Sequence, residues 1–538
     1  MVRPTPVWSV PVRPATVSSA DAGPASVDAS RAAVGDQITV RGGAHGLGVC
    51  LTELESAADV LEGVGRDVGE VAVVVGAAAG DPALAVAATL APAEALAAES
   101  AILACAGVRG AYGLSVRVLA TAEATRAAVV LYREGERAVE SLFDGVATGA
   151  GVLVGAQAGA VAPGLAVGAA VLLGPRLVTD PGARGDALAV GLGLGQEVDE
   201  ILADHPWLVS VAADGVDGVI IGLGIGVPGL GPWMRAKAAR AGVPYPPRTQ
   251  VEALALLQAL TAGVALDEST HDVRVEARPP RPGRAPVTVE DLVARDPTRS
   301  ASSVRITGVP QPDGSWTWVV DVPGTQTFDP RAGRNPWDLT SNVLLVAGEQ
   351  TLTMQGVTRA LADAERRTGA RGRSRVVLTG HSQGGITAAA LAADPGFRRR
   401  FDVTHVVTSG APIGRAAVPE SVSVLSLEHR EDLVPALDGE DNPDRALWVT
   451  VERAVGEDLG PQGGASDAHD VDHYAQTARL VDQSTDPSLI AWRAGAADVL
   501  GAGSSEAGAG TSDGGEGGGE ALVLDYDIER VARRSSGR

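Results

Sequence analysis

The stretch with the clearest capacity for chemistry is residues 380–384, GHSQG, in which glycines flank a serine two residues away on each side. A β-branched apolar run at 376–379 precedes it, and an alanine-rich run to Ala393 follows it. Strand, sharp turn and helix in this order raise a serine above a sheet as a nucleophile. The glycines leave room where strand and helix cross, and the helix N-terminus offers N–H groups to developing negative charge. The stretch therefore predicts Ser382 as a nucleophile.

A nucleophilic serine needs two partners that the rest of the chain must supply. A histidine removes the proton of the hydroxyl, and an acid orients that histidine. In chains with this strand–turn–helix arrangement, the acid and then the histidine follow the serine. The acid candidates come after an apolar run at 422–427 and are Glu428, Glu431 and Asp432.

Two histidines later in the chain are candidates for the base. His469 and His473 lie four residues apart in the stretch 466–474, SDAHDVDHY. Asp470 has the side chain of an N-cap, which would leave His469 in a loop and put His473 in the first turn of a helix. Since the base of such a site comes from the loop after the last core strand, we prefer His469 and keep His473 as the alternative base.

Two further stretches resemble class 3 (fungal-type) lipases and related α/β-hydrolases. Residues 432–435, DLVP, are similar to their D-x-V-P stretch, and residues 408–414, TSGAPIG, are similar to their F-G-x-P-x-x-G stretch. The resemblance covers about residues 300–495 and implies that Asp432 is the acid. An alanine–histidine pair followed by a tyrosine, as at His469, is also similar to the lipase pattern.

The same site needs donors for the oxygen that becomes negatively charged during ester cleavage. Two N–H groups usually share this role, and one of them belongs to the residue after the serine, here Gln383. The other is expected in a loop after an earlier strand. Residues 323–325, PGT, resemble the oxyanion stretch of class 3 lipases, which implies Thr325 as the second donor.

These residues predict a serine hydrolase of the lipase or esterase type, which cleaves carboxylic esters through a Ser382–His469–Asp432 triad and an acyl-enzyme. This chemistry requires no cofactor and no metal. The two cysteines, Cys50 and Cys105, form no C-x-x-C pair or Cys/His cluster that would indicate a metal site.

Two alternative functions remain open. In the first, the protein is a secreted or membrane-associated interaction or effector protein whose N-terminal helices are primary. In the second, the hydrolase fold serves only for binding.

The elements around the motifs predict an α/β fold for residues 301–500. Strands are expected at 304–309 and 316–322, joined by the turn residues Pro-Asp-Gly at 312–314. After the serine motif, further strands are expected at 403–408, 422–427 and 446–451. Strands that alternate with helices imply a mainly parallel sheet, so we expect a C-terminal α/β-hydrolase domain.

The rest of the chain divides by composition. The helical segment expected at residues 36–144 resembles the WXG100-like proteins of actinobacterial type VII secretion. Its Tyr132 and Glu136 are spaced as in the Y-x-x-x-E export pattern of those proteins. From N- to C-terminus we expect a disordered lead-in at 1–35, a helical hairpin or bundle at 36–144, a Gly/Ala-rich apolar helical region at 145–276, a Pro-rich linker at 277–300, and after the hydrolase domain a flexible tail at 501–538 that can form a short terminal strand.

The net charge of −22 argues against binding to nucleic acid or to anionic membranes by charge. The expected partners are a small-molecule or lipid ester and, through the N-terminal helices, a membrane or secretion machinery. The first residues lack the apolar segment of an ordinary signal peptide. We therefore expect a protein that is cytoplasmic or exported by a leaderless route, and membrane association is compatible with either location.

Overall fold

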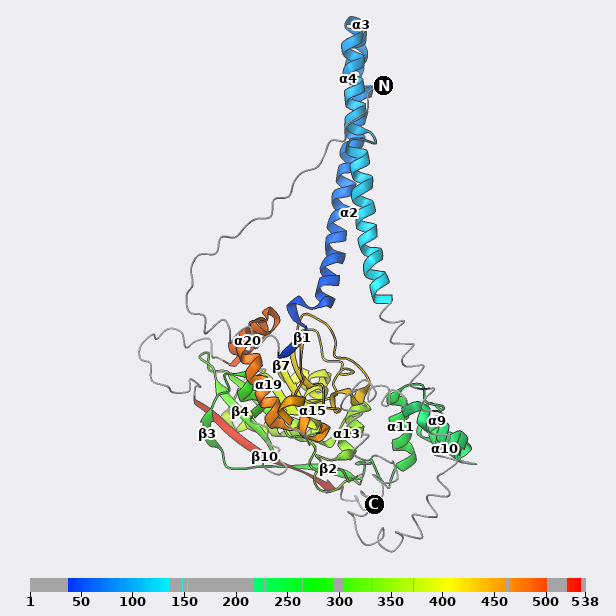
Figure 1. Cartoon of the computed structure of the whole chain (residues 1–538). Coiled ribbons are helices and arrows are strands. Elements are labelled where there is room, and N and C mark those ends of the chain that lie inside the picture. Colours follow the sequence, from blue (N-terminus) through cyan, green and yellow to red (C-terminus); the bar gives the residue numbers. More distant parts are fainter. Residues whose placement is uncertain are drawn as a thin grey trace.

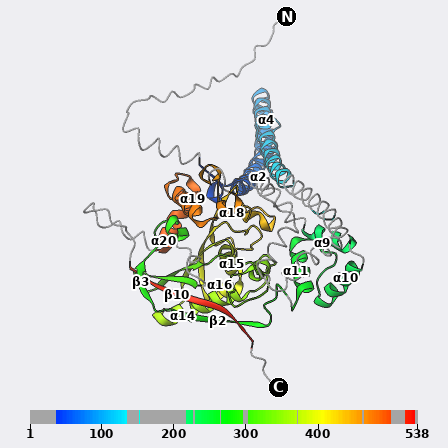
Figure 2. The ribbon, with the colours of Figure 1, turned by 60° about the horizontal axis from the view of Figure 1, so that its bottom comes forward.

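The computed structural model describes residues 37–134, 148, 152, 216–226, 229–263, 265–294, 303–329, 331–370, 372–459, 464–500 and 520–533. A long helical hairpin stands off a body built on one sheet, and a small group of helices lies beside that body (Figures 1 and 2). The expected lead-in at 1–35, most of the apolar region 145–215, the tail segment 501–519 and the export pattern at Glu136 lie outside the described residues.

The body is organised around a ten-stranded sheet in the order β1-β9-β8-β7-β6-β5-β4-β10-β2, with β3 paired to β10. The central strands β5 to β9 are parallel, and the strands that flank them pair antiparallel. The predicted parallel centre and the predicted hairpin at its border are both present. The strands are β1 (Ile38–Gly42), β2 (His271–Ala277), β3 (Arg281–Arg284), β4 (Ser303–Pro310), β5 (Trp316–Val322), β6 (Arg375–His381), β7 (Asp402–Ser409), β8 (Ser423–His429), β9 (Trp448–Arg453) and β10 (Glu520–Ala532).

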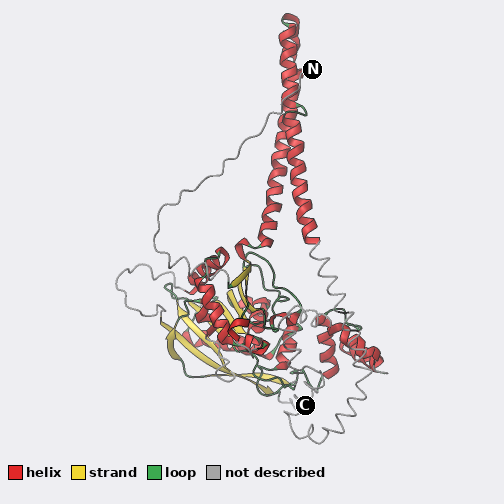
Figure 3. Cartoon of the chain, in the orientation of Figure 1, coloured by secondary structure: helices red, strands yellow, loops and turns green. Residues whose placement is uncertain are grey.

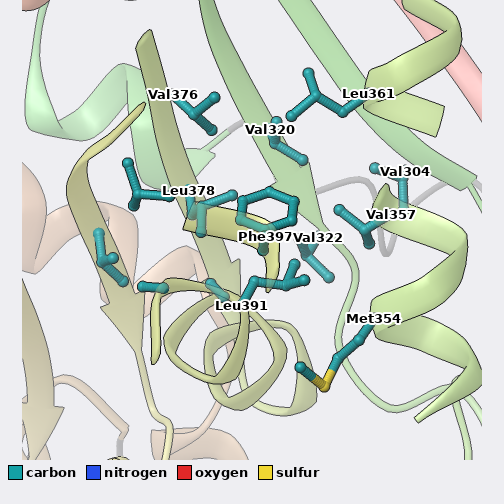
Figure 4. Packing of buried hydrophobic residues seen from close by; sticks show 14 of the residues in the cluster. Val304, Val320, Val322, Met354, Val357, Leu361, Val376, Leu378, Leu391 and Phe397 are labelled. Atoms are coloured by element: carbon teal, nitrogen blue, oxygen red, sulfur yellow. The ribbon is translucent and has the colours of Figure 1, made fainter. Parts of the chain in front are cut away.

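Helices cover both faces of this sheet (Figure 3). Successive side chains of a strand point to opposite faces, so each strand contributes to both cores. On β6, Val376 and Leu378 pack in one core and Val377 packs in the other. Figure 4 shows the first core, where Leu378 lies with Leu391 and Phe397. The helices that cover this first core are α14 (Leu352–Thr368), α15 (Gln383–Ala393) and α16 (Pro395–Arg400), and α13 (Leu339–Val346) packs against α15. The helices that cover the second core are α12 (Val289–Ala294), α19 (Val471–Gln483) and α20 (Pro487–Leu500).

The hairpin contains much of the expected helical segment. One limb is α2 (Leu47–Ala77) and α3 (Pro82–Leu90), and the other is α4 (Pro92–Ala106) and the helical residues 111–134. The buried residues of α2 recur at every seventh position and are Leu51, Ala58, Gly65 and Ala72. A seven-residue repeat of this kind forms a narrow seam between two helices.

A third group of helices belongs to the described part of the Gly/Ala-rich region. It comprises α9 (Val216–Gly226), α10 (Leu230–Ala241) and α11 (Gln250–Thr261). These helices have a small core of their own that includes Met234, Ala253 and Leu256. Helix α11 also contacts α13, which places this group next to the body.

The structure corrects three expectations about the borders of the body. The segment expected to begin the helical hairpin starts with β1, which pairs with β9 at the sheet edge. The expected linker at 277–300 instead holds β3, which accommodates Pro282 because it pairs with β10 alone, and α12. The terminal strand is long and lies inside the sheet, between β4 and β2. Local composition could not reveal these strands because their partners are hundreds of residues away.

Candidate active site

Ser382 lies at the turn between β6 and α15 in a strained backbone conformation, with φ 55° and ψ −124°. The glycines around it are required by contact. A Cβ on Gly380 would lie 2.2 Å from the carbonyl carbon of Gly384, and a Cβ on Gly384 would lie 2.1 Å from the oxygen of Val322. Since no side chain fits either position, the glycines allow the crossing that holds the serine in its strained turn.

The structure brings together one acid and one histidine of the predicted set. His469 Nδ1 lies 2.7 Å from Asp432 Oδ2, and the carboxylate is fully buried. The second carboxylate oxygen accepts the amide of Val434 at 2.9 Å. An ionised carboxylate accepts from Nδ1–H, which leaves the other ring nitrogen, Nε2, free to accept a proton.

Tyr474 is the third group on this carboxylate. Its hydroxyl donates to Asp432 Oδ2 at 2.7 Å, and its ring stacks on the ring of His429 with centroids 3.8 Å apart. Burial raises the pKa of this phenol well above its usual value, so the group stays a proton donor to the acid. The tyrosine after the histidine was part of the lipase-like pattern, but its contact with the acid was not predicted.

Two histidines, the half-buried His381 and the buried His429, hold the loop that carries His469. His381 Nε2 lies 2.8 Å from the carbonyl oxygen of His469, and His429 Nδ1 lies 2.7 Å from the carbonyl oxygen of Ala468. Burial lowers the pKa of His381 to about 3 and the pKa of His429 to about 4. Both rings are therefore neutral near pH 7, and each donates its single N–H to a carbonyl of this loop.

The other histidine candidate has a different environment. Asp470 caps α19 as expected, with its side chain accepting the amide of Asp472, and His473 lies in the first turn of the helix. Nδ1 of His473 is buried without a hydrogen-bond partner among the described residues. Of the two candidates, the structure pairs His469 and not His473 with the acid.

The serine and the acid–histidine pair lie beside one another. The rings of His381, the residue before the serine, and His469 have centroids 4.4 Å apart. No hydrogen bond joins the Ser382 hydroxyl to His469 within the described residues. Catalytic hydrogen bonds are often long without substrate and tighten when it binds. The His469 side chain is 21% exposed, so the ring is open to an incoming group.

The expected oxyanion donors flank the same turn. Gln383 begins α15, and its side chain donates to the carbonyl of Asp338 at 3.2 Å. The Thr325 hydroxyl accepts from Asn342 Nδ2 at 3.0 Å. Next to Thr325, a Cβ on Gly324 would lie 3.5 Å from the Cβ of Ser382. The segment that carries Thr325 therefore passes directly over the serine.

A buried ionic cluster anchors the start of α13, which carries Asn342. Asp338 caps this helix and pairs with Arg530 of β10, whose guanidinium also binds Glu268. The side chains of Arg530 and Asp338 are 0% and 1% exposed. Burial raises the pKa of Asp338, and the arginine opposes that rise. Nothing in the sequence pattern connected this arginine, near the C-terminus, with the predicted site.

No group of three or more His, Cys, Asp or Glu side chains positioned to hold a metal ion occurs among the described residues. Cys50 and Cys105 are free and exposed on the hairpin.

Comparison with known proteins gave no match to any family model, to any curated protein or to any solved structure.

Proposed function

We propose that this protein is a serine hydrolase of the α/β-hydrolase class that cleaves carboxylic esters, as lipases and esterases do. The observation that carries the proposal is the hydrogen bond of 2.7 Å between the buried carboxylate of Asp432 and His469, beside a serine held at φ 55°. A buried carboxylate paired with one histidine nitrogen makes the other nitrogen a base. The strained turn presents the serine hydroxyl to that base and to substrate.

The reaction follows from these positions. Ser382 Oγ attacks the ester carbonyl carbon while its proton passes to His469 Nε2, and the carbonyl oxygen becomes an oxyanion. The carbon–oxygen bond to the alcohol then breaks, and His469 returns the proton to the leaving alcohol. Water attacks the acyl-enzyme by the same route and releases the acid and the free serine. Asp432 keeps its charge throughout and stabilises the imidazolium.

The amides of Gln383 and Thr325 are the proposed donors to the oxyanion. Hydrogen bonds of their side chains hold both residues in position, since the Gln383 side chain donates to the Asp338 carbonyl and the Thr325 hydroxyl accepts from the Asn342 amide. Donors that are already oriented stabilise the developing charge without rearrangement, and each contributes about 10²–10³-fold to kcat.

Labelling with a fluorophosphonate probe tests this proposal. The probe reacts with a serine only when its base is in place, so the wild type is expected to label and Ser382→Ala is expected not to. Loss of labelling in His469→Ala, but not in His473→Ala, assigns the base. A folded wild type that does not label would contradict the proposal and favour a hydrolase fold used for binding.

A second candidate function depends on the hairpin. Its helices expose many large apolar side chains, and the stretch Pro92–Glu134 is long and apolar enough to cross a membrane, with only 11% of its most apolar window buried. The bent pair 47–80 and 82–90 passes the same length and composition test if it is counted as one span. Ala-rich surfaces also favour close helix packing. An interaction protein that contacts a membrane or a secretion machinery through these helices fits this surface.

Flotation with neutral liposomes, beside light scattering of the protein alone, tests this second candidate. Flotation of the full chain that is lost when residues 47–134 are deleted supports membrane contact. A concentration-dependent mass without flotation supports helix association instead. A monomer that does not float would contradict both forms of this second function.

A further inference from the structure

Arg530 of β10 is a buried cation that takes no direct part in the proposed reaction. Its Nε donates to Glu268 at 2.9 Å, and its two terminal nitrogens donate to both carboxylate oxygens of Asp338. The same two nitrogens donate to Ser341 Oγ at 2.8 Å and to the carbonyl of Asn335 at 3.3 Å. A guanidinium carries its N–H donors in one rigid plane, and these contacts use all three of its nitrogens. The group is therefore fixed in position and in orientation.

Most of these contacts reach one short segment, residues 335–341. This segment includes Asp338, the N-cap of α13, and the first turn of that helix. The backbone of β10 binds just before it, since the Arg530 amide donates to the carbonyl of Arg334 at 2.7 Å. One arginine therefore ties the whole of residues 334–341 to the sheet.

Residues 334–341 in turn hold the segment that carries Thr325. The carbonyl of Trp337 accepts the amide of Gln326 at 2.8 Å and the amide of Thr327 at 3.2 Å. Helix α13 holds the Thr325 hydroxyl as well, through a hydrogen bond from its second turn. The position of this proposed oxyanion donor therefore depends on the segment that Arg530 fixes.

The other proposed donor depends on the same segment. Gln383 donates its side-chain amide to the backbone carbonyl of Asp338 at 3.2 Å. Asp338 thus binds Arg530 through its carboxylate and Gln383 through its carbonyl. Both oxyanion donors are therefore linked to one buried guanidinium through residues 335–341.

The chemistry of this cluster suits a precise support. Burial of one arginine with two carboxylates is costly, because all three groups lose their water. A bidentate pair between arginine and a carboxylate also fixes the relative orientation of the two groups, which apolar contacts do not. Donors to an oxyanion need such precision, since a shift of about 1 Å in a catalytic group lowers the rate about 10²-fold.

We propose that Arg530 is a positioning residue that orients both oxyanion donors, Gln383 and Thr325, through residues 335–341. The proposal rests on the proposed function, since it takes the amides of these two residues as the donors. It makes β10 a strand that supports catalysis. Loss of the arginine fork should raise the barrier to the step that forms the oxyanion and leave the binding of substrate nearly unchanged.

The experiment measures kcat and KM for p-nitrophenyl butyrate, and the Ki of a trifluoromethyl ketone, with the full chain and its variants. The serine adds to the ketone carbonyl and forms an oxyanion, so the affinity for this inhibitor reports on the donors. Arg530→Met should lower kcat about 10²-fold. Arg530→Lys keeps the charge without the fork and should lower kcat about tenfold. In both variants KM should stay within about twofold of the wild-type value.

Asp338→Asn tests the same pair from its other side. Asparagine still caps the helix and keeps the backbone carbonyl that binds Gln383, and Arg530 remains paired with Glu268. The variant should therefore fold, and its kcat should fall about tenfold because the bidentate pair is lost. In every variant the Ki of the ketone should rise by the factor by which kcat falls. The pH profile of kcat/KM should not move, because the triad is untouched.

Asp527→Asn is the matched control on the same strand. It breaks an exposed ion pair with Arg278 and should change neither kcat nor Ki. Arg530→Met leaves two buried carboxylates without their cation and can fail to fold, in which case Arg530→Lys and Asp338→Asn decide.

A kcat within about twofold of wild type in folded Arg530→Lys and Asp338→Asn would overturn the proposal. A fall in kcat without a matching rise in Ki would overturn it too, since that pattern indicates a general structural role. Failure of the proposed function looks different, because the wild type would then neither label with a fluorophosphonate nor hydrolyse the butyrate.

Discussion

The body and the hairpin are both rich in alanine, valine and leucine, yet they use these residues in opposite ways. In the body, Val320, Leu378 and Val406 are 0% exposed between the sheet and its helices. In the hairpin, only four of the 31 residues of α2 are buried, and Val73 and Val74 are 73% and 70% exposed. A layered fold encloses its side chains on all sides, whereas two helices alone can enclose only a seam.

The difference explains why the proposed chemistry lies in the body. A catalytic pair needs neighbours that hold each atom from several directions, as Tyr474, Val434 and His469 hold the carboxylate of Asp432. The hairpin instead buries one narrow seam of residues and leaves its other side chains exposed to solvent. Single substitutions should therefore have large and specific effects in the body and small effects in the hairpin.

The largest expected effect is on catalysis. Asp432→Asn should lower kcat for ester hydrolysis about 10⁴-fold, because an amide holds the histidine in the wrong tautomer. Asp81→Asn, at the N-cap of α3 in the hairpin, is the matched control and should leave kcat unchanged. Steady-state kinetics on a short-chain ester measures both. A loss of less than tenfold at Asp432 would remove this residue from the mechanism.

The next effect is on stability. Leu378→Ala in β6 should lower the free energy of unfolding by about 2–5 kcal/mol, because it removes a fully buried side chain. Leu54→Ala, at a hairpin position that is 47% exposed, should change it by less than about 0.5 kcal/mol. Denaturant unfolding followed by circular dichroism compares the two. A large cost at Leu54 would mean that another molecule covers the hairpin in solution.

A third effect depends on pH. His405 of β7 has no hydrogen-bond partner for either ring nitrogen within the described residues, and burial lowers its pKa from 6.5 to about 4. Between these values the unfolded chain binds the proton and the folded chain does not. Stability is therefore fully present above pH 6.5 and is lost as pH falls towards 4, by about 2 kcal/mol at pH 5.

His405→Leu removes this proton-linked loss. The stability of the variant relative to wild type should rise by about 2 kcal/mol between pH 8 and pH 5, measured by denaturant unfolding at each pH. In the hairpin, by contrast, the buried residues of α2 are Leu51, Ala58, Gly65 and Ala72. None of them is titratable, so their burial adds no pH dependence of this kind to stability. An equal difference at both pH values would mean that the imidazole is protonated or hydrated in the folded protein.

The smallest expected effect is a difference in stability between alanine substitutions at two glycines of α2. A Cβ on Gly63 meets nothing within 4 Å, so Gly63→Ala should stabilise the helix by about 0.5–1 kcal/mol. A Cβ on Gly65 would lie 2.8 Å from the side chain of Leu119 across the seam. Gly65→Ala should therefore gain less or destabilise. Thermal melting followed at 222 nm ranks the two variants, and equal gains would show that the seam is loose.

Much of the site geometry could be predicted because it is encoded locally. The strand, the glycines and the helix around Ser382 follow one another directly, and Asp470 caps α19 as its side chain indicated. These features depend on steric contacts and hydrogen bonds between residues a few positions apart. Local pattern also favoured His469 over His473 before the structure paired His469 with Asp432.

Other parts of the site could not be read locally, because their partners are distant in the sequence. His429 was assigned no role, yet it binds the carbonyl of Ala468, 39 residues later. Arg530 pairs with Asp338 across 192 positions. A contact of this kind depends on which strands become neighbours, and no spacing rule connects the two residues beforehand.

The sequence by itself determined the strand–turn–helix around Ser382, the choice of Asp432 and His469 as partners, the parallel centre of the sheet and the helical nature of most of the hairpin. Only the tertiary structure decided that β1 and β10 belong to the sheet and that two neutral histidines hold the loop of His469. Backbone preference and periodicity act over one or two turns of chain. A buried side chain, by contrast, needs contacts from several segments that are distant in the sequence. Those contacts exist only once the whole chain has folded.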